Sequence, residues 1–330
     1  MEPKLASVIK KITGATDIED ADLIQTLWKG YGKILKVKLK GGPIPNVVVK
    51  HVAAPKHIGQ RRKGKPDASH SRKVKSYQIE PRFYTEYAGK CDDECRVPTC
   101  LGTEKHGDEV VLVLEDLDAA GFPSRSPDAA WHEMTAGLCW LAAFHATFLH
   151  QKPEGLWNVG TYWHLDPRAE ELKKLNDPEL KAAAWAIDRR LRNTPRTFVH
   201  GDAKIQNFCF SPDGGKVAAV DFQYVGGGCG MKDVAYFVSS CLYESDCEEM
   251  ETALLDIYFE ALRSSVAKRH RGVNVSELED AWRPLYRVAW ADFHRFYKGW
   301  GNMRFSKNSY SERVSKAVCA MLRSKRQVDR

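Results

Sequence analysis

No stretch of this 330-residue chain is apolar for long enough to cross a membrane. The longest uncharged run, residues 134–151, is interrupted by threonines and histidines and falls short of the roughly 20 apolar residues of a transmembrane helix. The first residues, MEPKLASVIKK, carry charges where a signal peptide would have an apolar core. We therefore expect a cytoplasmic protein that does not span a membrane.

The sequence also lacks a C-x-x-C pair, although it contains nine cysteines. An odd number of scattered cysteines is typical of reduced thiols in the cytosol rather than of a disulfide framework. Cys91, Cys95 and Cys100 cluster in CDDECRVPTC, which raises the alternative of a zinc site. Because no fourth ligand is evident, we favour free thiols.

Repeats and low-complexity tracts are absent as well, and the composition is that of an ordinary globular protein. Hydrophobic residues make up 43% of the chain and charged residues 28%, so nothing limits the formation of a core. A length of 330 residues suggests roughly two domains or lobes.

The net charge is +7, and much of the positive charge lies in one segment, residues 56–75. This segment contains Lys56, Arg61, Arg62, Lys63, Lys65, Arg72, Lys73 and Lys75. It could attract phosphates or an acidic substrate, but its Gly, Pro and Ser residues favour a solvated loop. No aromatic residues are interleaved with the charges, so we do not expect nucleic-acid binding.

The segment with the clearest chemical pattern is FVHGDAKIQNFCFSPDGGKVAAVDF, residues 198–222. It contains the pattern His-x-Asp-x-x-x-x-Asn as His200, Asp202 and Asn207, followed by Asp221. Asp202 is a candidate general base, and the oxygens of Asn207 and Asp221 are suitable ligands for Mg²⁺. The alternative is an ordinary polar loop followed by a hairpin.

The same segment predicts a β-hairpin. SPDGG supplies turn residues between the short runs NFCF and KVAAV. Because the start of one hairpin strand lies beside the end of its partner, Asn207 and Asp221 are expected at the same end of the hairpin.

These motifs resemble those of the aminoglycoside phosphotransferase and choline kinase-like families. They are most similar to the ecdysteroid-kinase-like branch, in which HGD, N and DFQ recur in this order. The later GGGCGMKDVAYF, with Asp233, fits the same pattern. The resemblance implies an α+β, protein-kinase-like fold with an N-lobe at 1–117 and a C-lobe at 118–330. It also implies transfer of the γ-phosphate of ATP, with Mg²⁺, to a hydroxyl of a small molecule.

The N-terminal third predicts the elements of such an N-lobe. We expect a helix at 4–12, a strand, glycine turn and strand at 23–39, and a strand at 46–52. A helix at 75–88 and a strand at 110–114 follow.

The resemblance assigns roles to individual residues of this lobe. Gly30 and Gly32 frame the turn expected to cover the nucleotide phosphates, although the third glycine of the family pattern is missing. Lys50, centred in an apolar strand, is expected to bind the α- and β-phosphates; the alternative is a surface lysine on an edge strand. Its expected partner is Glu80, with Glu86 as the alternative.

The connector LVLEDL corresponds to the hinge at which the adenine meets the backbone, at Glu115 to Leu117. Ser126 and Pro127 predict the start of a helix at 128–150, in which His145 is expected to be a core residue.

A second C-lobe helix is expected at 178–191, and residues 247–330 are helical by pattern. A stripe of aromatic residues in this last part supports two interpretations, a buried helix, which we favour, or the wall of an acceptor pocket with Asp292 holding a cation. The stripe comprises Trp282, Tyr286, Trp290, Phe293, Phe296, Tyr297 and Trp300.

In the catalytic segment, the resemblance implies that Asp202 accepts the proton of the acceptor hydroxyl and Lys204 contacts the moving phosphoryl group. His200 is expected to brace the loop and Asp233 to anchor it. Gln223 stands where choline kinases often carry an acid, which weakens any specific expectation of choline.

No APE-like segment follows Asp221, so a protein kinase is the less favoured alternative. An inactive nucleotide-binding regulatory protein is another. The sequence leaves the acceptor, the pathway and the oligomeric state open.

Overall fold

The computed structural model describes residues 1–53, 68–126, 128–301 and 305–328, and the chain forms two compact units. The first unit comprises Met1–Asp92, Arg96–Ser124 and Cys209–Gln223. The second unit comprises Asp93–Cys95, Arg125–Phe208 and Tyr224–Arg330. Residues 209–223 group with the first unit, so the two units are not continuous in sequence. The predicted division into lobes at residue 117 stays a prediction.

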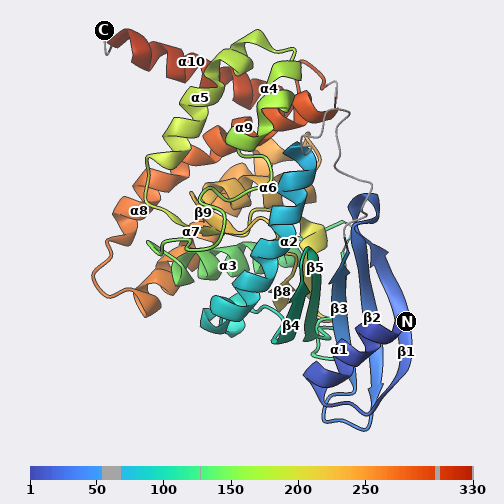
Figure 1. Cartoon of the computed structure of the whole chain (residues 1–330). Coiled ribbons are helices and arrows are strands. Elements are labelled where there is room, and N and C mark those ends of the chain that lie inside the picture. Colours follow the sequence, from blue (N-terminus) through green and yellow to red (C-terminus); the bar gives the residue numbers. More distant parts are fainter. Residues whose placement is uncertain (54–67, 127, 302–304, 329–330) are drawn as a thin grey trace, which may run out of the picture. The chain divides into compact units, whose positions relative to one another are not determined.

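The first unit is built on a five-stranded antiparallel sheet with the strand order β1-β2-β3-β5-β4 (Figure 1). Its elements are α1 (Pro3–Thr13), β1 (Asp17–Thr26), β2 (Gly32–Lys40), β3 (Asn46–Val52), α2 (Ala68–Glu86), β4 (Cys100–His106), β5 (Glu109–Glu115), β7 (Phe208–Phe210) and β8 (Val217–Ala219). Leu5, Val8 and Ile9 of α1 pack onto the sheet against Val37 and Val49. Alternating valines in the strands supply this apolar face.

Helix α2 begins seven residues earlier than the sequence indicates. It runs from Ala68 to Glu86, so the predicted start near residue 75 was wrong. Its first turns are polar and give no apolar period, which explains the error. Arg72, Lys73 and Lys75 of the basic segment therefore lie on a helix, whereas residues 56–65 lie outside the described residues.

Strand β4 was not predicted from the sequence. It is an edge strand paired with β5, and most of its side chains are only partly buried, so it shows no alternation of polar and apolar residues.

The alternative of a zinc site at Cys91, Cys95 and Cys100 gains no support. Within the described parts of the chain, no three His, Cys, Asp or Glu side chains are placed to hold a metal.

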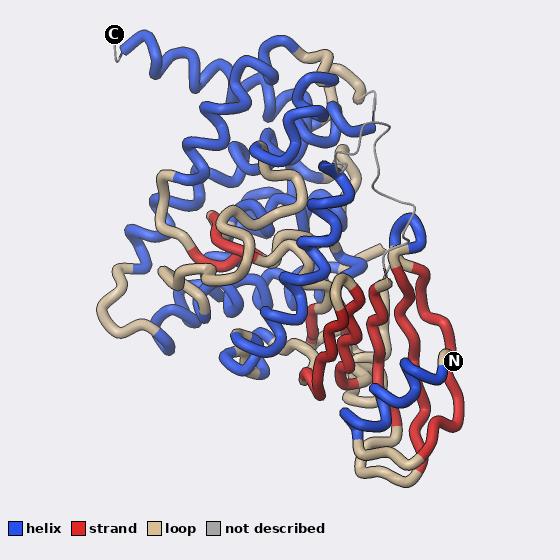
Figure 2. Tube along the Cα trace, in the orientation of Figure 1, coloured by secondary structure: helices blue, strands red, loops and turns tan. Residues whose placement is uncertain are grey.

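The second unit is mostly helical (Figure 2). Its elements are α3 (Trp131–Thr147), α4 (Ala169–Lys174), α5 (Pro178–Arg192), β6 (Thr197–Val199), β9 (Gly226–Gly228), α6 (Met231–Cys241), α7 (Cys247–Arg269), α8 (Val275–Trp282), α9 (Tyr286–Gly301) and α10 (Tyr310–Val328). Among the described residues, no helix is both long and apolar enough to span a bilayer. The α+β class expected from the sequence is confirmed.

Helix α3 begins at Trp131, so the predicted start at Ser126 was wrong. Ala130 occupies the N-cap position, and its N–H is satisfied by the Glu133 carboxylate at 2.8 Å. Ser126 instead donates its hydroxyl hydrogen to the same carboxylate oxygen. The acid in the first turn thus accepts both the N–H of the N-cap residue and the hydroxyl of Ser126.

The aromatic stripe supports the interpretation as a buried helix. Trp282, Tyr286 and Trp290 are buried, whereas Trp300, at the end of α9, is 60% exposed. Asp292 is 1% exposed and is already paired with two cations of the protein, Arg295 at 2.8 Å and Lys232 at 3.3 Å. The alternative in which Asp292 receives a cationic substrate is therefore disfavoured.

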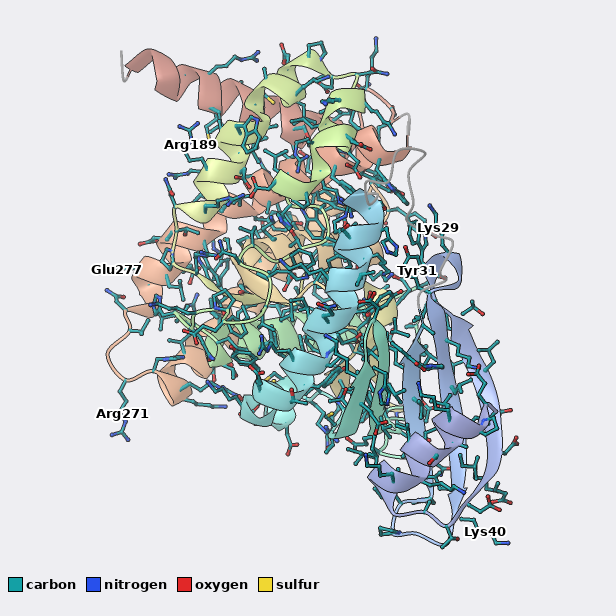
Figure 3. The ribbon with its side chains drawn as sticks, in the orientation of Figure 1. Lys29, Tyr31, Lys40, Arg189, Arg271 and Glu277 are labelled. Atoms are coloured by element: carbon teal, nitrogen blue, oxygen red, sulfur yellow. The ribbon has the colours of Figure 1, made fainter. Side chains whose placement is uncertain are left out.

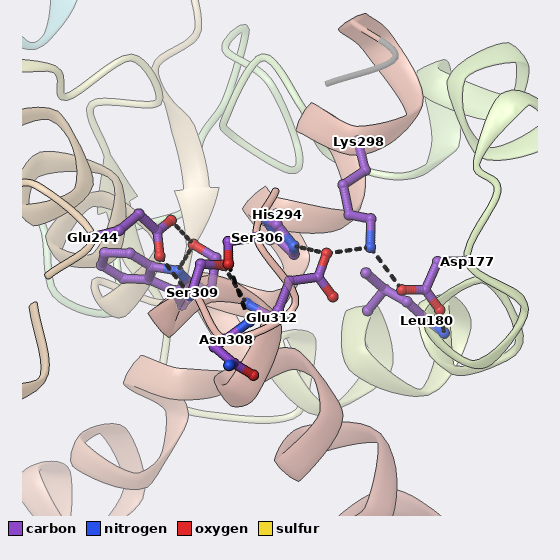
Figure 4. A network of polar contacts seen from close by, with 11 residues as sticks. Asp177, Leu180, Glu244, His294, Lys298, Ser306, Asn308, Ser309 and Glu312 are labelled. Atoms are coloured by element: carbon purple, nitrogen blue, oxygen red, sulfur yellow. Dashed lines mark hydrogen bonds and ion pairs between the residues drawn. The ribbon is translucent and has the colours of Figure 1, made fainter. Parts of the chain in front are cut away.

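A polar network ties α5, α9 and α10 together (Figure 4). Lys298 of α9 contacts Asp177 at 2.8 Å and Glu312 at 2.6 Å. Asp177 is also the N-cap of α5, where it accepts the N–H of Leu180. The ring of His294 lies 3.4 Å from the Glu312 carboxylate. Because Lys298 contacts both carboxylates, this network fixes the three helices better than isolated ion pairs would.

His164 makes the stability of the second unit sensitive to acid. Burial lowers the pKa of its imidazole from 6.5 to about 4, although the Thr161 carbonyl lies 2.8 Å from Nδ1. Below pH 6.5 the unfolded chain binds a proton that the folded chain excludes, so the free energy of unfolding falls as the pH decreases. We expect a loss of about 2–3 kcal/mol between pH 6.5 and 4.

Urea denaturation at a series of pH values measures this loss. The His164→Gln variant should show a flatter pH dependence than the wild type, whereas His132→Gln, at an exposed position, should not. Equal slopes for the wild type and His164→Gln would contradict the prediction.

Candidate active site

Lys50 is the buried charge at the centre of the first unit. It lies in β3, is 5% exposed, and its Nζ contacts Glu80 Oε2 at 2.7 Å and Asp221 Oδ1 at 2.9 Å. Burial alone would lower the pKa of this ammonium, but the charges of Asp221 and Glu80 outweigh it and raise the pKa. Glu80 is therefore the helix partner. Glu86 instead pairs with Arg82 on the surface of α2.

The glycine turn joins β1 and β2 at residues 28–32 (Figure 3). Gly32 has a φ of 149°, and a Cβ there would lie 2.0 Å from the carbonyl oxygen of His51 in β3. Gly30 has a φ of 74°. Tyr31, between them, is buried and hydrogen-bonded to His70 Nδ1 at 2.6 Å. The local geometry requires these glycines, and their role toward a nucleotide stays a prediction.

The side chains of the connector contact protein groups. Both oxygens of Glu115 accept from Arg96 at 2.6 Å, and one accepts the Thr99 N–H. Partial burial opposes ionisation, yet these donors hold the pKa of Glu115 below its ordinary value. Leu117 is buried in an apolar cluster with Cys209. Any contact with a nucleotide base from this connector would therefore involve its backbone.

Asp233 fixes the backbone of the predicted catalytic loop in the second unit. It is fully buried in α6, and its carboxylate accepts the N–H groups of His200 and Gly201. His145 Nε2 lies 3.2 Å from the same carboxylate, and its Nδ1 lies 2.8 Å from the Tyr258 hydroxyl. The anchoring expected of Asp233 and the core position expected of His145 are both present.

Asp202 follows this anchored backbone. Its N–H donates to His200 Nδ1 at 3.2 Å, and its carbonyl accepts the side-chain amide of Asn207 at 2.7 Å. Lys204 reaches the Asp202 carboxylate only at 3.9 Å, and its side chain is 37% exposed. His200 is fully buried, so its position matches a bracing role better than proton transfer.

Asn207 and Asp221 flank the hairpin formed by β7 and β8. Asn207 precedes β7, and its side-chain nitrogen donates to the Asp202 carbonyl. Its side-chain oxygen can therefore accept a hydrogen bond or bind a metal ion. Asp221 follows β8 and supplies a partly exposed carboxylate. Hard oxygen donors of this kind fit Mg²⁺. The two residues belong to different compact units, so their joint role stays a prediction.

Sequence reasoning missed two tyrosines beside Asp202. The Tyr162 hydroxyl donates to Tyr236 at 3.2 Å. Burial first, and then the charge and hydrogen bonding of Asp202, raise the pKa of Tyr236 well above its ordinary value. Tyr236 lies three residues after Asp233 in KDVAYF, so helical spacing could have indicated it. No comparable signal marks Tyr162.

A comparison with protein families decides the affiliation of the chain. The profile of the phosphotransferase enzyme family matches residues 52–272. The chain belongs to this family. A search of curated proteins gave no match. The ecdysteroid-kinase-like branch expected from the sequence stays a prediction.

Solved structures show the fold of this phosphotransferase. Choline kinase from Cryptosporidium parvum is similar with a TM-score of 0.56 at 10% identity, covering 98% of this chain and 95% of that one. Plasmodium vivax ethanolamine kinase gives 0.50 at 14%, covering 93% and 84%. The GDP complex of aminoglycoside 2′-phosphotransferase-IIIa gives 0.50 at 10%, covering 98% and 100%. The predicted kinase-like fold is confirmed.

Replacing Asp233 by Asn should loosen the loop at residues 198–202. The amide keeps one acceptor oxygen for two backbone donors and places an NH₂ group against the other donor. We expect faster hydrogen exchange in peptides that contain residues 198–202, with peptides of α1, in the first unit, as the internal control. Unchanged protection of residues 198–202 would show that Asp233 does not hold this loop.

Proposed function

We propose that this protein is a cytoplasmic, ATP- and Mg²⁺-dependent kinase of the ecdysteroid-kinase-like branch. It transfers the γ-phosphate to a hydroxyl of a small molecule. The observation that carries the proposal is the ammonium of Lys50, which is held charged in an apolar strand by Glu80 and Asp221. A fold that needed only packing would not require this charge, since an apolar side chain in the strand would avoid its desolvation.

The family resemblance assigns nucleotide binding and metal binding to different residues. Lys50 steadies the α- and β-phosphates beneath the turn that contains Gly30 and Gly32, and the backbone from Glu115 to Leu117 meets the nucleotide base. Asn207 and Asp221 are the residues that would hold Mg²⁺. When bound, the ion neutralises charge on the phosphates.

The proton and the phosphoryl group move in opposite directions in this reaction. The acceptor oxygen forms a bond to the γ-phosphorus while the bond to the β–γ bridging oxygen breaks. Asp202 accepts the hydroxyl proton, and Lys204 donates to the oxygens of the transferred group. Positioning supplies most of the acceleration, which fits a loop whose backbone is fixed by Asp233.

The donor and acceptor classes follow from the relatives. The similar structures are a choline kinase, an ethanolamine kinase and an aminoglycoside phosphotransferase, so we propose a small hydroxylated acceptor. One relative was solved with GDP, which supports a purine nucleotide as the donor. Gln223 differs from the acid common in choline kinases, and choline itself is therefore not singled out.

The Asp202→Asn variant tests the proposal. A panel of amino alcohols, aminoglycosides and hydroxylated metabolites is incubated with Mg-ATP, and mass spectrometry detects products that have gained one phosphoryl group. With the acceptor found in this way, the variant should lose about 10²–10⁴-fold in turnover, the usual contribution of a general base. Its affinity for the nucleotide should stay close to that of the wild type.

The Asp256→Asn variant, at an exposed position on α7, is the matched control and should keep full turnover. Undiminished turnover of Asp202→Asn would remove Asp202 from the mechanism. A wild-type protein that binds Mg-ATP but phosphorylates nothing in the panel would support the regulatory alternative instead.

A further inference from the structure

Gln223 connects the carboxylate of Asp221 to helix α2. Its Nε2 donates to Asp221 Oδ1 at 2.6 Å. Its Oε1 accepts from Lys73 Nζ at 2.8 Å and, more weakly, from Ser76 Oγ at 3.4 Å, whose hydroxyl hydrogen is shared with the Lys73 carbonyl at 2.8 Å. Gln223 is 4% exposed and Ser76 is fully buried. Within the first unit, the side-chain amide of Gln223 therefore donates through its nitrogen and accepts through its oxygen.

Asp221 needs such support because of its backbone. Its φ of 70° lies in the left-handed region, which a non-glycine residue adopts only at a cost in free energy. Lys50 and Gln223 both donate to the same oxygen, Oδ1. Fixing one oxygen of a carboxylate also fixes the direction in which the other one points. These two bonds therefore determine how Asp221 presents its carboxylate.

Lys50 and Gln223, the two donors to Asp221, differ in how strongly a nucleotide phosphate would attract them. Lys50 carries a charge that Glu80 and Asp221 already share, and its proposed role is to bind phosphates as well. Gln223 is neutral and has no attraction of comparable strength to a phosphate. The amide is therefore the donor that stays with Asp221 when the ammonium turns to the nucleotide.

Helix α2 forms the support for this arrangement. Lys73, Ser76, Glu80 and Phe83 recur at intervals of three and four residues, so they share one face of the helix. Phe83 stacks on Phe222 with ring centroids 4.1 Å apart. One helical face thus contacts Lys50 as well as the side chains of Phe222 and Gln223.

We infer that Gln223 is a positioning residue for the metal-binding carboxylate: it holds Asp221 Oδ1 while Lys73 and Ser76 hold Gln223. The inference rests on the proposed function. Glutamate at this position could still accept from Lys73 and Ser76, but when ionised it could not donate to Asp221 and would repel it. This explains why an amide, and not an acid, suits this chain.

The test measures how strongly Mg²⁺ improves nucleotide binding. Isothermal titration gives the dissociation constant of a non-hydrolysable ATP analogue with and without Mg²⁺, and the ratio of the two constants reports the metal. Because loss of a group that orients a metal ligand costs about 10–100-fold in metal affinity, Gln223→Met should lower this ratio about tenfold or more. The metal-free constant should change little, since Lys50 is intact.

Gln223→Glu separates the two ends of the amide. It keeps the acceptor for Lys73 and Ser76 but removes the donor to Asp221, so the same loss is expected near neutral pH. A ratio in Gln223→Glu equal to or above that of the wild type would overturn the inference, as would an unchanged ratio in Gln223→Met.

Two further variants guard against a folding defect. Lys73→Met removes the partner of Gln223 at a half-buried position and should reduce the ratio in the same direction, by a smaller factor. Lys75→Met removes a charge from an exposed position of the same helix and should leave the ratio unchanged. If Gln223→Met does not fold, an unchanged ratio in Lys73→Met overturns the inference.

The outcome also distinguishes this inference from the proposed function. A wild-type protein that does not bind the analogue more tightly with Mg²⁺ overturns both. If Mg²⁺ clearly strengthens binding of the analogue to the wild type and the variants show the same ratio of dissociation constants, only the role of Gln223 is overturned.

Discussion

The ammonium of Lys50 is the constraint on which the first unit depends. A buried charge is stable only with charged partners, and here the partners come from α2 and from the segment after β8. Three parts of the sequence, represented by Lys50, Glu80 and Asp221, must therefore meet at one nitrogen atom. This contact determines which face of α2 points toward Lys50. On the same face, Phe83 stacks on Phe222 and Lys73 donates to Gln223. The arrangement of the candidate nucleotide site follows from this single requirement.

The second unit uses a buried carboxylate for a related purpose. Asp233 satisfies two backbone donors of the loop that carries Asp202, and in doing so it fixes the shape of that loop. Buried polar groups are costly unless they are paired, so each pairing excludes alternative conformations of the residues it joins. In both units, carboxylates hold the residues expected to perform the chemistry: Glu80 and Asp221 hold Lys50, and Asp233 holds the loop of Asp202. This is the property required of a catalyst that acts by positioning.

Local sequence patterns predicted many elements and failed at identifiable points. The β-branched run at residues 46–52 became β3, and the apolar period at 178–191 became α5. The beginning of α2 was missed because its first turns are polar, and β4 was missed because an edge strand with partly exposed side chains shows no alternation. The expected cap at Ser126 also failed, since α3 begins at Trp131 and Ala130 stands at its N-cap. At these three points the local pattern is weak or misleading, so it did not predict the observed structure.

The sequence by itself determined the family motifs and the short-range geometry: the spacing of Asp202 and Asn207, and the hairpin that follows them. These are local properties, because a few residues and one turn decide them. Only the tertiary structure decided that Glu80 rather than Glu86 pairs with Lys50, that Asp292 is already neutralised, and that Gln223 joins Asp221 to α2. Those choices depend on which side chains meet from distant parts of the chain, up to 150 residues apart for Lys73 and Gln223. No local pattern encodes such meetings, since the packing of the core selects among partners that are chemically equivalent in the sequence.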